Sequence, residues 1–217
     1  MAFKTMYDLV RHSLEKFSDR LAFKMLGGEE VSFSEVGERI KKVQQMLTSA
    51  GLKPGDKVAL YSSSMPNWGV SYFAVVTAGM VVVPILPGFS GEEVAKILDH
   101  SESKALLVSD KLYAKLPKAS VEALNIVIRT KNLKMLSQRV EGEGSMAVPQ
   151  PEDLASIIYT SGTTSSPKGV MHTHQSLCSQ LHLLQNLYPI HRDDVWLSVL
   201  PLSHTYECSL GMLFPMS

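Results

Sequence analysis

The sequence has few cysteines, no excess of either charge and no apolar leader. Its two cysteines, Cys178 and Cys208, are too few for a disulfide framework, and their wide spacing is not that of a metal knuckle. The 21 basic residues are balanced by 21 acidic ones, so no overall field favours nucleic acid. Charges scattered through residues 1–20 do not fit the apolar core of a signal peptide. These absences predict a reduced, cytoplasmic compartment and no nucleic-acid partner.

One stretch resembles a membrane span because it lacks charge. No Asp, Glu, Lys or Arg occurs between Lys57 and Glu92, and much of this stretch is apolar. Prolines and glycines interrupt it, however, and predict a short helix followed by a buried β-branched strand at 81–83. We therefore expect core structure here and at most peripheral contact with a membrane.

Strand and helix signals alternate along the chain. In three places a hydroxyl residue stands three positions before an acidic one, which is typical of a capping box, and Gly51 is placed to end the second of the resulting helices. The alternation predicts an α/β fold with layered, mostly parallel sheets flanked by helices. The expected elements are helices beginning at Thr5–Asp8, Ser32–Glu35 and Ser90–Glu93, a helix at 66–78, and strands at 58–61, 81–83, 105–108, 126–128 and 154–159.

A polar segment separates the last of these strands from the preceding elements. Residues 141–152 read EGEGSMAVPQPE, with glycine and proline but no hydrophobic periodicity. Such composition predicts a loop, and we expect a subdomain boundary within 140–153.

The loop that follows the strand at 154–159 has the composition of a polyphosphate site. Residues 159–169 read YTSGTTSSPKG, which combines hydroxyl donors, glycines whose N–H groups can turn toward an anion, and the charge of Lys168. A solvent-exposed linker has similar composition. The common G-x-x-x-x-G-K-S/T loop fits less well, because Pro167 removes a backbone donor and Gly169 replaces the hydroxyl that would bind magnesium.

Over nearly its whole length this loop resembles the signature of the adenylate-forming superfamily, which includes acyl- and aryl-CoA synthetases, luciferases and peptide-synthetase adenylation domains. The usual form is YTSGTTG-x-PKG, and this chain departs from it at Ser165. The sequence LPLSHTYE at 200–207 resembles the second signature of the family. Residues 51–87 resemble its glycine-aspartate turn, strand, helix and Gly-x-Val-x-x-Pro strand. The similarity runs from about Thr5 to Ser217.

The resemblance implies an enzyme in which ATP and a carboxylic acid give an acyl-adenylate and pyrophosphate. A thiol, commonly coenzyme A, then takes the acyl group. By similarity, the loop would hold the β- and γ-phosphates of ATP, with Mg²⁺ as a further cofactor. Fatty acids are favoured as substrates because LPLSHTYE resembles the long-chain branch. The cofactor-binding residues implied are Thr160, Ser161, Gly162, Thr163, Thr164, Ser165 and Lys168.

Two residues of the second signature receive roles from the resemblance. His204 corresponds to the position beside the substrate carboxylate, although a lone histidine is also commonly a partly buried structural side chain. Glu207 would help to hold Mg²⁺ or would satisfy a nearby helix. His172 and His174 have the spacing of a metal pair, but no third ligand follows, so no metal is assigned. The helix expected from His174 would bury the stripe Leu177, Leu181, Leu184 and Leu187.

Parts of the family pattern have no counterpart in the chain: the adenine-binding segment, the ribose-binding aspartate, and the C-terminal domain with the catalytic lysine. We therefore expect residues 1–217 to be a partial N-terminal domain, an excised or truncated piece without synthetase activity of its own. Adenylation in peptide synthesis and luciferase-like oxidation stay as alternative activities within the superfamily. A non-catalytic nucleotide-binding or interaction module is the alternative of another class.

Overall fold

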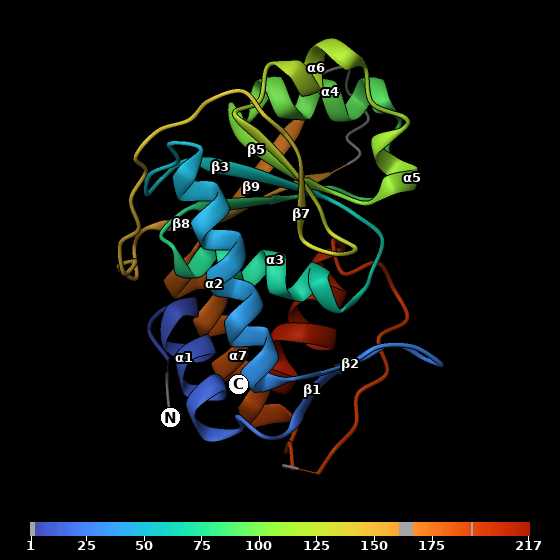
Figure 1. Ribbon diagram of the computed structural model, residues 1–217. Helices are drawn as coiled ribbons and strands as arrows, with labels where there is room; N and C mark the ends of the chain where they lie inside the picture. The colour runs from blue at the N-terminus through green and yellow to red at the C-terminus, as the bar shows by residue number, and fades with distance from the viewer. Residues whose placement is uncertain (1–2, 161–166, 192) are drawn as a thin grey trace.

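A mixed sheet forms the centre of the computed structural model, which describes residues 3–160, 167–191 and 193–217 (Figure 1). The strands are β1 (Leu21–Lys24), β2 (Glu30–Ser32), β3 (Lys57–Tyr61), β4 (Val81–Pro84), β5 (Ser103–Val108), β6 (Ile126–Arg129), β7 (Lys134–Gln138), β8 (Leu154–Thr160) and β9 (Lys168–Thr173). The helices are α1 (Met6–Lys16), α2 (Phe33–Ser49), α3 (Pro66–Thr77), α4 (Gly91–His100), α5 (Asp110–Tyr113), α6 (Lys118–Glu122), α7 (His174–Leu187), the π-helix η1 (Glu207–Leu213) and the 3₁₀-helix η2 (Phe214–Met216).

The strand order confirms the predicted mostly parallel sheet. It is β7-β6-β5-β3-β4-β8-β9, in which β6, β5, β3, β4 and β8 run parallel. The edge strands β7 and β9 are antiparallel to their neighbours, and β1 and β2 form a separate antiparallel hairpin. The predicted strands correspond to the parallel ones. The hairpin, the edge strands β7 and β9, the short helices α5 and α6, and η1 and η2 were not predicted.

Local signals in the sequence set the ends of the main helices. In α1, α2 and α4 the predicted capping boxes are confirmed, because each N-cap hydroxyl accepts the acidic residue's N–H at 3.1–3.3 Å and the carboxylate accepts the N-cap N–H in return. Gly51 follows α2 with a φ of 76°. Its N–H donates to the Thr48 carbonyl at 2.9 Å, and the Leu52 N–H donates to the Leu47 carbonyl at 3.2 Å. Glycine thus ends α2 in the left-handed conformation, as predicted.

The uncharged stretch that resembled a membrane span is the most buried helix of the fold. Pro66 begins α3 at a position where its missing N–H costs nothing, and every residue of the helix is buried. Within α3, Trp68 stacks on Tyr72 with ring centroids 5.6 Å apart. The stretch is apolar because α3 packs against α1, α2 and the sheet. Within the described part of the chain, no helix has the length and apolar character needed to cross a membrane.

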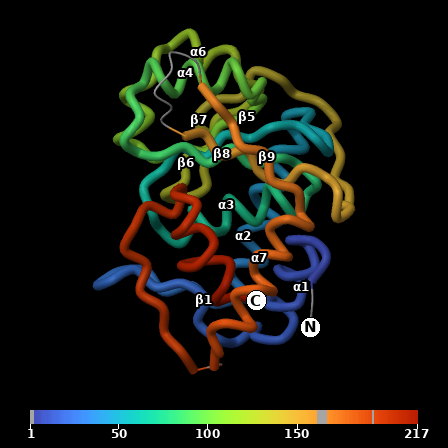
Figure 2. The backbone as a smooth tube through the Cα atoms, turned by 180° about the vertical axis from the view of Figure 1, so that it is seen from behind, coloured from blue at the N-terminus to red at the C-terminus, as the bar shows by residue number. Residues whose placement is uncertain are grey.

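Two layers of helices cover the two faces of the sheet. The helices α1, α2, α3 and α7, together with η1 and η2, pack on one face, here called the lower face as drawn in Figure 1. The helices α4, α5 and α6 cover the opposite, upper face. Figure 2 shows α7 beside α1 and the C-terminal segment from behind. In α7 the predicted stripe is buried at Leu177 and Leu181, but the prediction was wrong for Leu187, which is 70% exposed because the last turn extends past the core.

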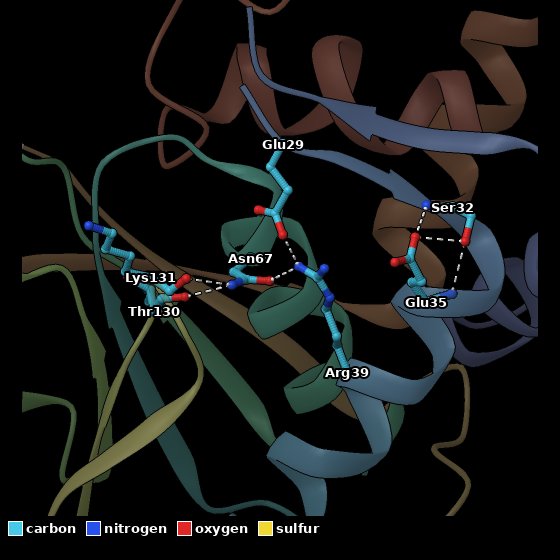
Figure 3. A network of polar contacts seen from close by, with 7 residues as sticks. All are labelled: Glu29, Ser32, Glu35, Arg39, Asn67, Thr130 and Lys131. Atoms are coloured by element: carbon cyan, nitrogen blue, oxygen red, sulfur yellow. Dashed lines mark hydrogen bonds and ion pairs between the residues drawn. The ribbon is translucent and has the colours of Figure 1, made fainter. Parts of the chain in front are cut away.

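A buried amide joins four parts of the chain at the start of α3 (Figure 3). The Asn67 side-chain NH₂ donates to the carbonyls of Thr130 and Lys131 at 2.9 and 3.1 Å. Its oxygen accepts from Arg39 at 2.9 Å, and Arg39 is paired with Glu29 at 2.8 Å. This network ties α2, α3, the β1–β2 hairpin and the turn after β6 together, which secures the carboxyl edge of the parallel strands.

The polar segment between β7 and β8 is an ordered loop, as predicted. Gly142 and Gly144 donate their N–H groups to the carbonyls of Ser49 and Thr48 at 3.0 and 2.9 Å. A Cβ on Gly144 would lie 2.1 Å from the Leu52 carbonyl oxygen, so glycine permits the close approach. The loop therefore follows the end of α2. A subdomain boundary within 140–153 stays a prediction.

Candidate functional site

The candidate loop joins β8 to β9, which form an antiparallel hairpin at one edge of the sheet. Thr160 and Lys168 are directly opposite each other as the last residue of β8 and the first residue of β9. The strand β8 is buried up to Tyr159, as its apolar sequence requires, and Thr160 and Lys168 are exposed. The other predicted loop residues, Ser161, Gly162, Thr163, Thr164 and Ser165, lie outside the described residues.

The strand alternation places the Thr160 and Lys168 side chains on one face of the hairpin. Ile157 and Tyr159 belong to the core of the upper face, under α4. Because successive side chains of a strand point to opposite faces, Thr160 points toward the lower face, on which α7 and η1 lie. Residues that are directly opposite in an antiparallel pair share a face, so Lys168 points the same way. A hydroxyl and an ammonium group thus flank the exposed end of the hairpin on one side, as an anion site requires.

Gly169 is needed for the packing of the hairpin next to Lys168. A Cβ at this position would lie 2.6 Å from Cγ2 of Ile157 and 3.2 Å from Cζ of Tyr159. Both side chains come from β8 and lie across the glycine, so a larger residue would displace them from their packing positions. This gives a physical reason for glycine after the lysine.

The second signature is attached to the sheet through a hydroxyl that sequence reasoning missed. The Leu202 N–H donates to the hydroxyl of Ser64, which follows β3, at 3.0 Å. His204 is exposed and not partly buried, which contradicts the structural alternative for this residue. Its Nδ1 accepts the Tyr206 N–H at 3.3 Å, so Nε2 carries the proton of the neutral ring. The arrangement leaves the His204 ring accessible to a substrate.

Glu207 begins η1 and presents an unsatisfied carboxylate oxygen. The residue is 6% exposed, and among the described residues its Oε1 has no hydrogen-bond partner. The carboxylate folds over Gly211, where a Cβ would lie 2.2 Å from Oε1. Mg²⁺ in nucleotide sites is commonly bound by one or two carboxylates together with phosphate oxygens, so this group fits such an ion. No cluster of three His, Cys, Asp or Glu residues capable of holding a metal occurs within the described ranges.

Further hydroxyl groups lie at the carboxyl edge of the parallel strands. Ser62, after β3, and Thr130, after β6, are hydrogen bonded through their hydroxyls at 2.9 Å. Ser203 is buried, and its hydroxyl has no partner within the described ranges. Ligands of open parallel sheets bind at this edge. Sequence reasoning missed these residues because they are separated along the chain and form no continuous pattern.

The remaining candidate ligands are buried in the lower core. His174 begins α7, and its Nδ1 accepts the Met6 N–H at 3.2 Å. Burial lowers the His174 pKa to about 4, and Asp153 and Asp8 partly oppose the shift. Burial also raises the pKa of both thiols, Cys178 and Cys208, to about 12. These thiols are therefore protonated and unreactive at neutral pH.

Comparisons with known proteins place the chain among a defined group of enzymes. The family model described as AMP-binding enzyme matches residues 10–217. A probable CoA ligase of Humulus lupulus, CCL9, is 30% identical, over 96% of this chain and 42% of its own length. Tyrocidine synthase 3 of Brevibacillus parabrevis is also 30% identical, over 97% of this chain and 3% of its own length.

The comparison of structures gives the same fold. The crystal structure of the anthranilate CoA ligase AuaEII in complex with anthranoyl-AMP superposes with a TM-score of 0.86 at 22% identity, over 100% of this chain and 43% of that one. The chain thus spans less than half the length of these curated relatives and of this structure.

Proposed function

Because the chain belongs to the AMP-binding enzyme family, we propose that it forms the phosphate-binding part of an enzyme that activates a carboxylic acid with ATP. The observation that carries this proposal is the pairing of Thr160 with Lys168 at the exposed end of the β8–β9 hairpin, on either side of the hydroxyl-rich loop. The substrate carboxylate attacks the α-phosphorus of ATP, its oxygen forms the new P–O bond, and pyrophosphate leaves. The product is an acyl-adenylate.

The residues of the chain act by positioning and by charge. Lys168 neutralises the β- and γ-phosphates, and Thr160, Ser161, Thr163, Thr164 and Ser165 donate their hydroxyls to them. Gly162 donates its backbone N–H. His204 orients the attacking carboxylate oxygen through its protonated Nε2. Glu207 offers its free Oε1 to Mg²⁺, which when bound neutralises the charge that collects on the leaving pyrophosphate.

We infer that the acid is a fatty acid and that coenzyme A is the thiol that displaces AMP. The sequence LPLSHTYE and the similarity to a CoA ligase support this assignment. Adenylation in peptide synthesis is the second candidate, since tyrocidine synthase 3 is as similar as the CoA ligase. The 217 residues alone bind MgATP in this proposal but form no acyl-CoA, because the relatives use more than twice this length.

The test is ATP–pyrophosphate exchange in a protein extended by the downstream coding sequence. Fatty acids of several lengths, aromatic acids and amino acids are offered separately, and exchange with fatty acids is expected. Coenzyme A should then yield the acyl thioester. Exchange with amino acids alone would favour the peptide-synthesis candidate, and no exchange with any acid would leave the chain as a non-catalytic module. Acyl-CoA formed by residues 1–217 would refute their proposed inactivity.

A further inference from the structure

The end of the β8–β9 hairpin, at Tyr159 and Thr160, extends beyond β4, which ends at Pro84. Within the described residues, β8 is paired with β4 at one position, Ser156 opposite Val82, and from Ile157 to Thr160 its partner is β9. The exposed strand β9 lies at the edge of the sheet. The position of Thr160 and Lys168 therefore depends on side chains that connect the hairpin to the upper helices.

Tyr159 is the side chain that makes this connection. Its ring is 4% exposed, packs in the upper core and lies across Gly169, the residue next to Lys168. The phenol oxygen is 2.7 Å from Nδ1 of His100, and the two rings meet edge to face at 5.7 Å. Burial raises the Tyr159 pKa, so the phenol keeps its proton at neutral pH and can donate it to His100.

His100 is well placed to act as the fixed end of this bond. It is the last residue of α4, a helix whose start is secured by a capping box and whose Val94, Ile97 and Leu98 are buried in the upper core. The His100 ring itself is exposed. The histidine is therefore not needed to fill the core. Its contact with Tyr159 joins a rigid helix to the strand that leads into the loop.

We propose that His100 is a positioning residue for the phosphate site, holding Thr160 and Lys168 in register through its hydrogen bond to Tyr159. The inference rests on the proposed function of the hairpin, but it assigns a role to α4, which lies on the opposite face from His204 and Glu207. His100 contacts neither ATP nor the acid in this account. It acts through the phenol of Tyr159.

Three substitutions separate the hydrogen bond from the packing. His100→Ala removes the acceptor from an exposed position, and Tyr159→Phe removes the hydroxyl while keeping the ring over Gly169. His100→Asn restores an acceptor near the former Nδ1 position. His182→Ala, an exposed histidine on α7, serves as the matched control.

The measurement combines calorimetric titration of the 217-residue chain with magnesium tripolyphosphate and amide hydrogen exchange of residues 157–160 and 168–170. His100→Ala and Tyr159→Phe should each weaken tripolyphosphate binding by about three- to tenfold and speed exchange in the hairpin, since one partly buried hydrogen bond is lost. The double variant should be no worse than either single variant, and His100→Asn should recover most of the affinity. His182→Ala should match the wild type.

The outcomes distinguish this inference from the proposed function. If the wild type does not bind tripolyphosphate, the proposed phosphate site fails, and the exchange data still decide whether His100 orders the hairpin. Unchanged exchange in His100→Ala would overturn the positioning role. Faster exchange with undiminished tripolyphosphate affinity would overturn it as well, because His100 would then be structural only.

Discussion

The two tryptophans of the chain lie in regions that use their apolar residues differently. Trp68 belongs to the first region, residues 3–160, is fully buried and stacks on Tyr72. Trp196 belongs to the second region, residues 167–217, is 42% exposed and meets Phe214 edge-on. Its neighbours Val195 and Leu197 are 96% and 82% exposed. Hydrophobic sequence in the first region therefore builds the core, whereas in the second region much of it stays at the surface.

The segment between α7 and η1 explains the difference. It contains no helix or strand in its described part up to the turn before η1, 188–191 and 193–204. An ion pair between Arg20 and Asp193 at 2.7 Å links it to the first region, and the Asp193 side chain is 83% exposed. The hydrogen bond from the Leu202 N–H to Ser64 is a second link. Exposed pairs contribute little stability. The candidate residue His204 is exposed on this irregular segment, directly after Leu202 and Ser203, which are buried, while the first region supplies the rigid frame.

The largest expected effect compares the two tryptophans directly. Trp68→Ala should lower the free energy of unfolding by about 3–5 kcal/mol, because a fully buried aromatic side chain is lost from a packed core. Trp196→Ala should cost about 1 kcal/mol or less, because the side chain is partly in water already. Urea unfolding followed by circular dichroism measures both. Equal losses of unfolding free energy in the two variants would contradict the proposed difference between the two regions.

The second prediction concerns the stability of the fold at acidic pH, and it tests the contact between the two regions at His174. Burial holds the His174 pKa at about 4 in the folded chain, below its ordinary value of 6.5. The unfolded chain therefore binds the proton first as the pH falls, so this residue's contribution to stability is present above pH 6.5 and declines toward pH 4. The full loss amounts to about 3 kcal/mol.

Replacing the histidine should remove this loss. His174→Asn keeps an acceptor for the Met6 N–H but has no titrating group, so its stability should change much less between pH 6.5 and 4 than that of the wild type. The exposed His182→Asn variant is the control and should keep the wild-type dependence. Urea unfolding at a series of pH values gives the comparison. If His174→Asn loses as much stability between pH 6.5 and 4 as the wild type does, the assignment of this loss to His174 is contradicted.

Local sequence signals were sufficient for most of the first region. The capping boxes, Gly51 and the buried apolar strands are features of neighbouring residues, and each appears in the structure where it was predicted. The β1–β2 hairpin was missed because its strands have four and three residues and no clear alternation. The π-helix η1 was missed because its form depends on tertiary packing, with Glu207 folded over Gly211.

The candidate site likewise has a part that neighbouring residues predict and a part that only the fold brings together. The loop and its lysine could be predicted because their chemistry is contiguous in sequence. Ser64, which attaches the second signature, is 138 positions from its partner Leu202. His100 is 59 positions from Tyr159. Such contacts are products of the fold, and nothing in the residues beside them indicates the partner.

The most direct test of the account is the affinity of the 217-residue chain for MgATP in the wild type and in two lysine variants. Lys168→Ala should weaken binding by about ten- to a hundredfold, as expected for the loss of a charge-assisted hydrogen bond of about 1.5–3 kcal/mol. Lys134→Ala, at the opposite edge of the sheet on β7, should bind as the wild type does. Undiminished binding by Lys168→Ala would contradict the assignment of the hairpin as the phosphate site.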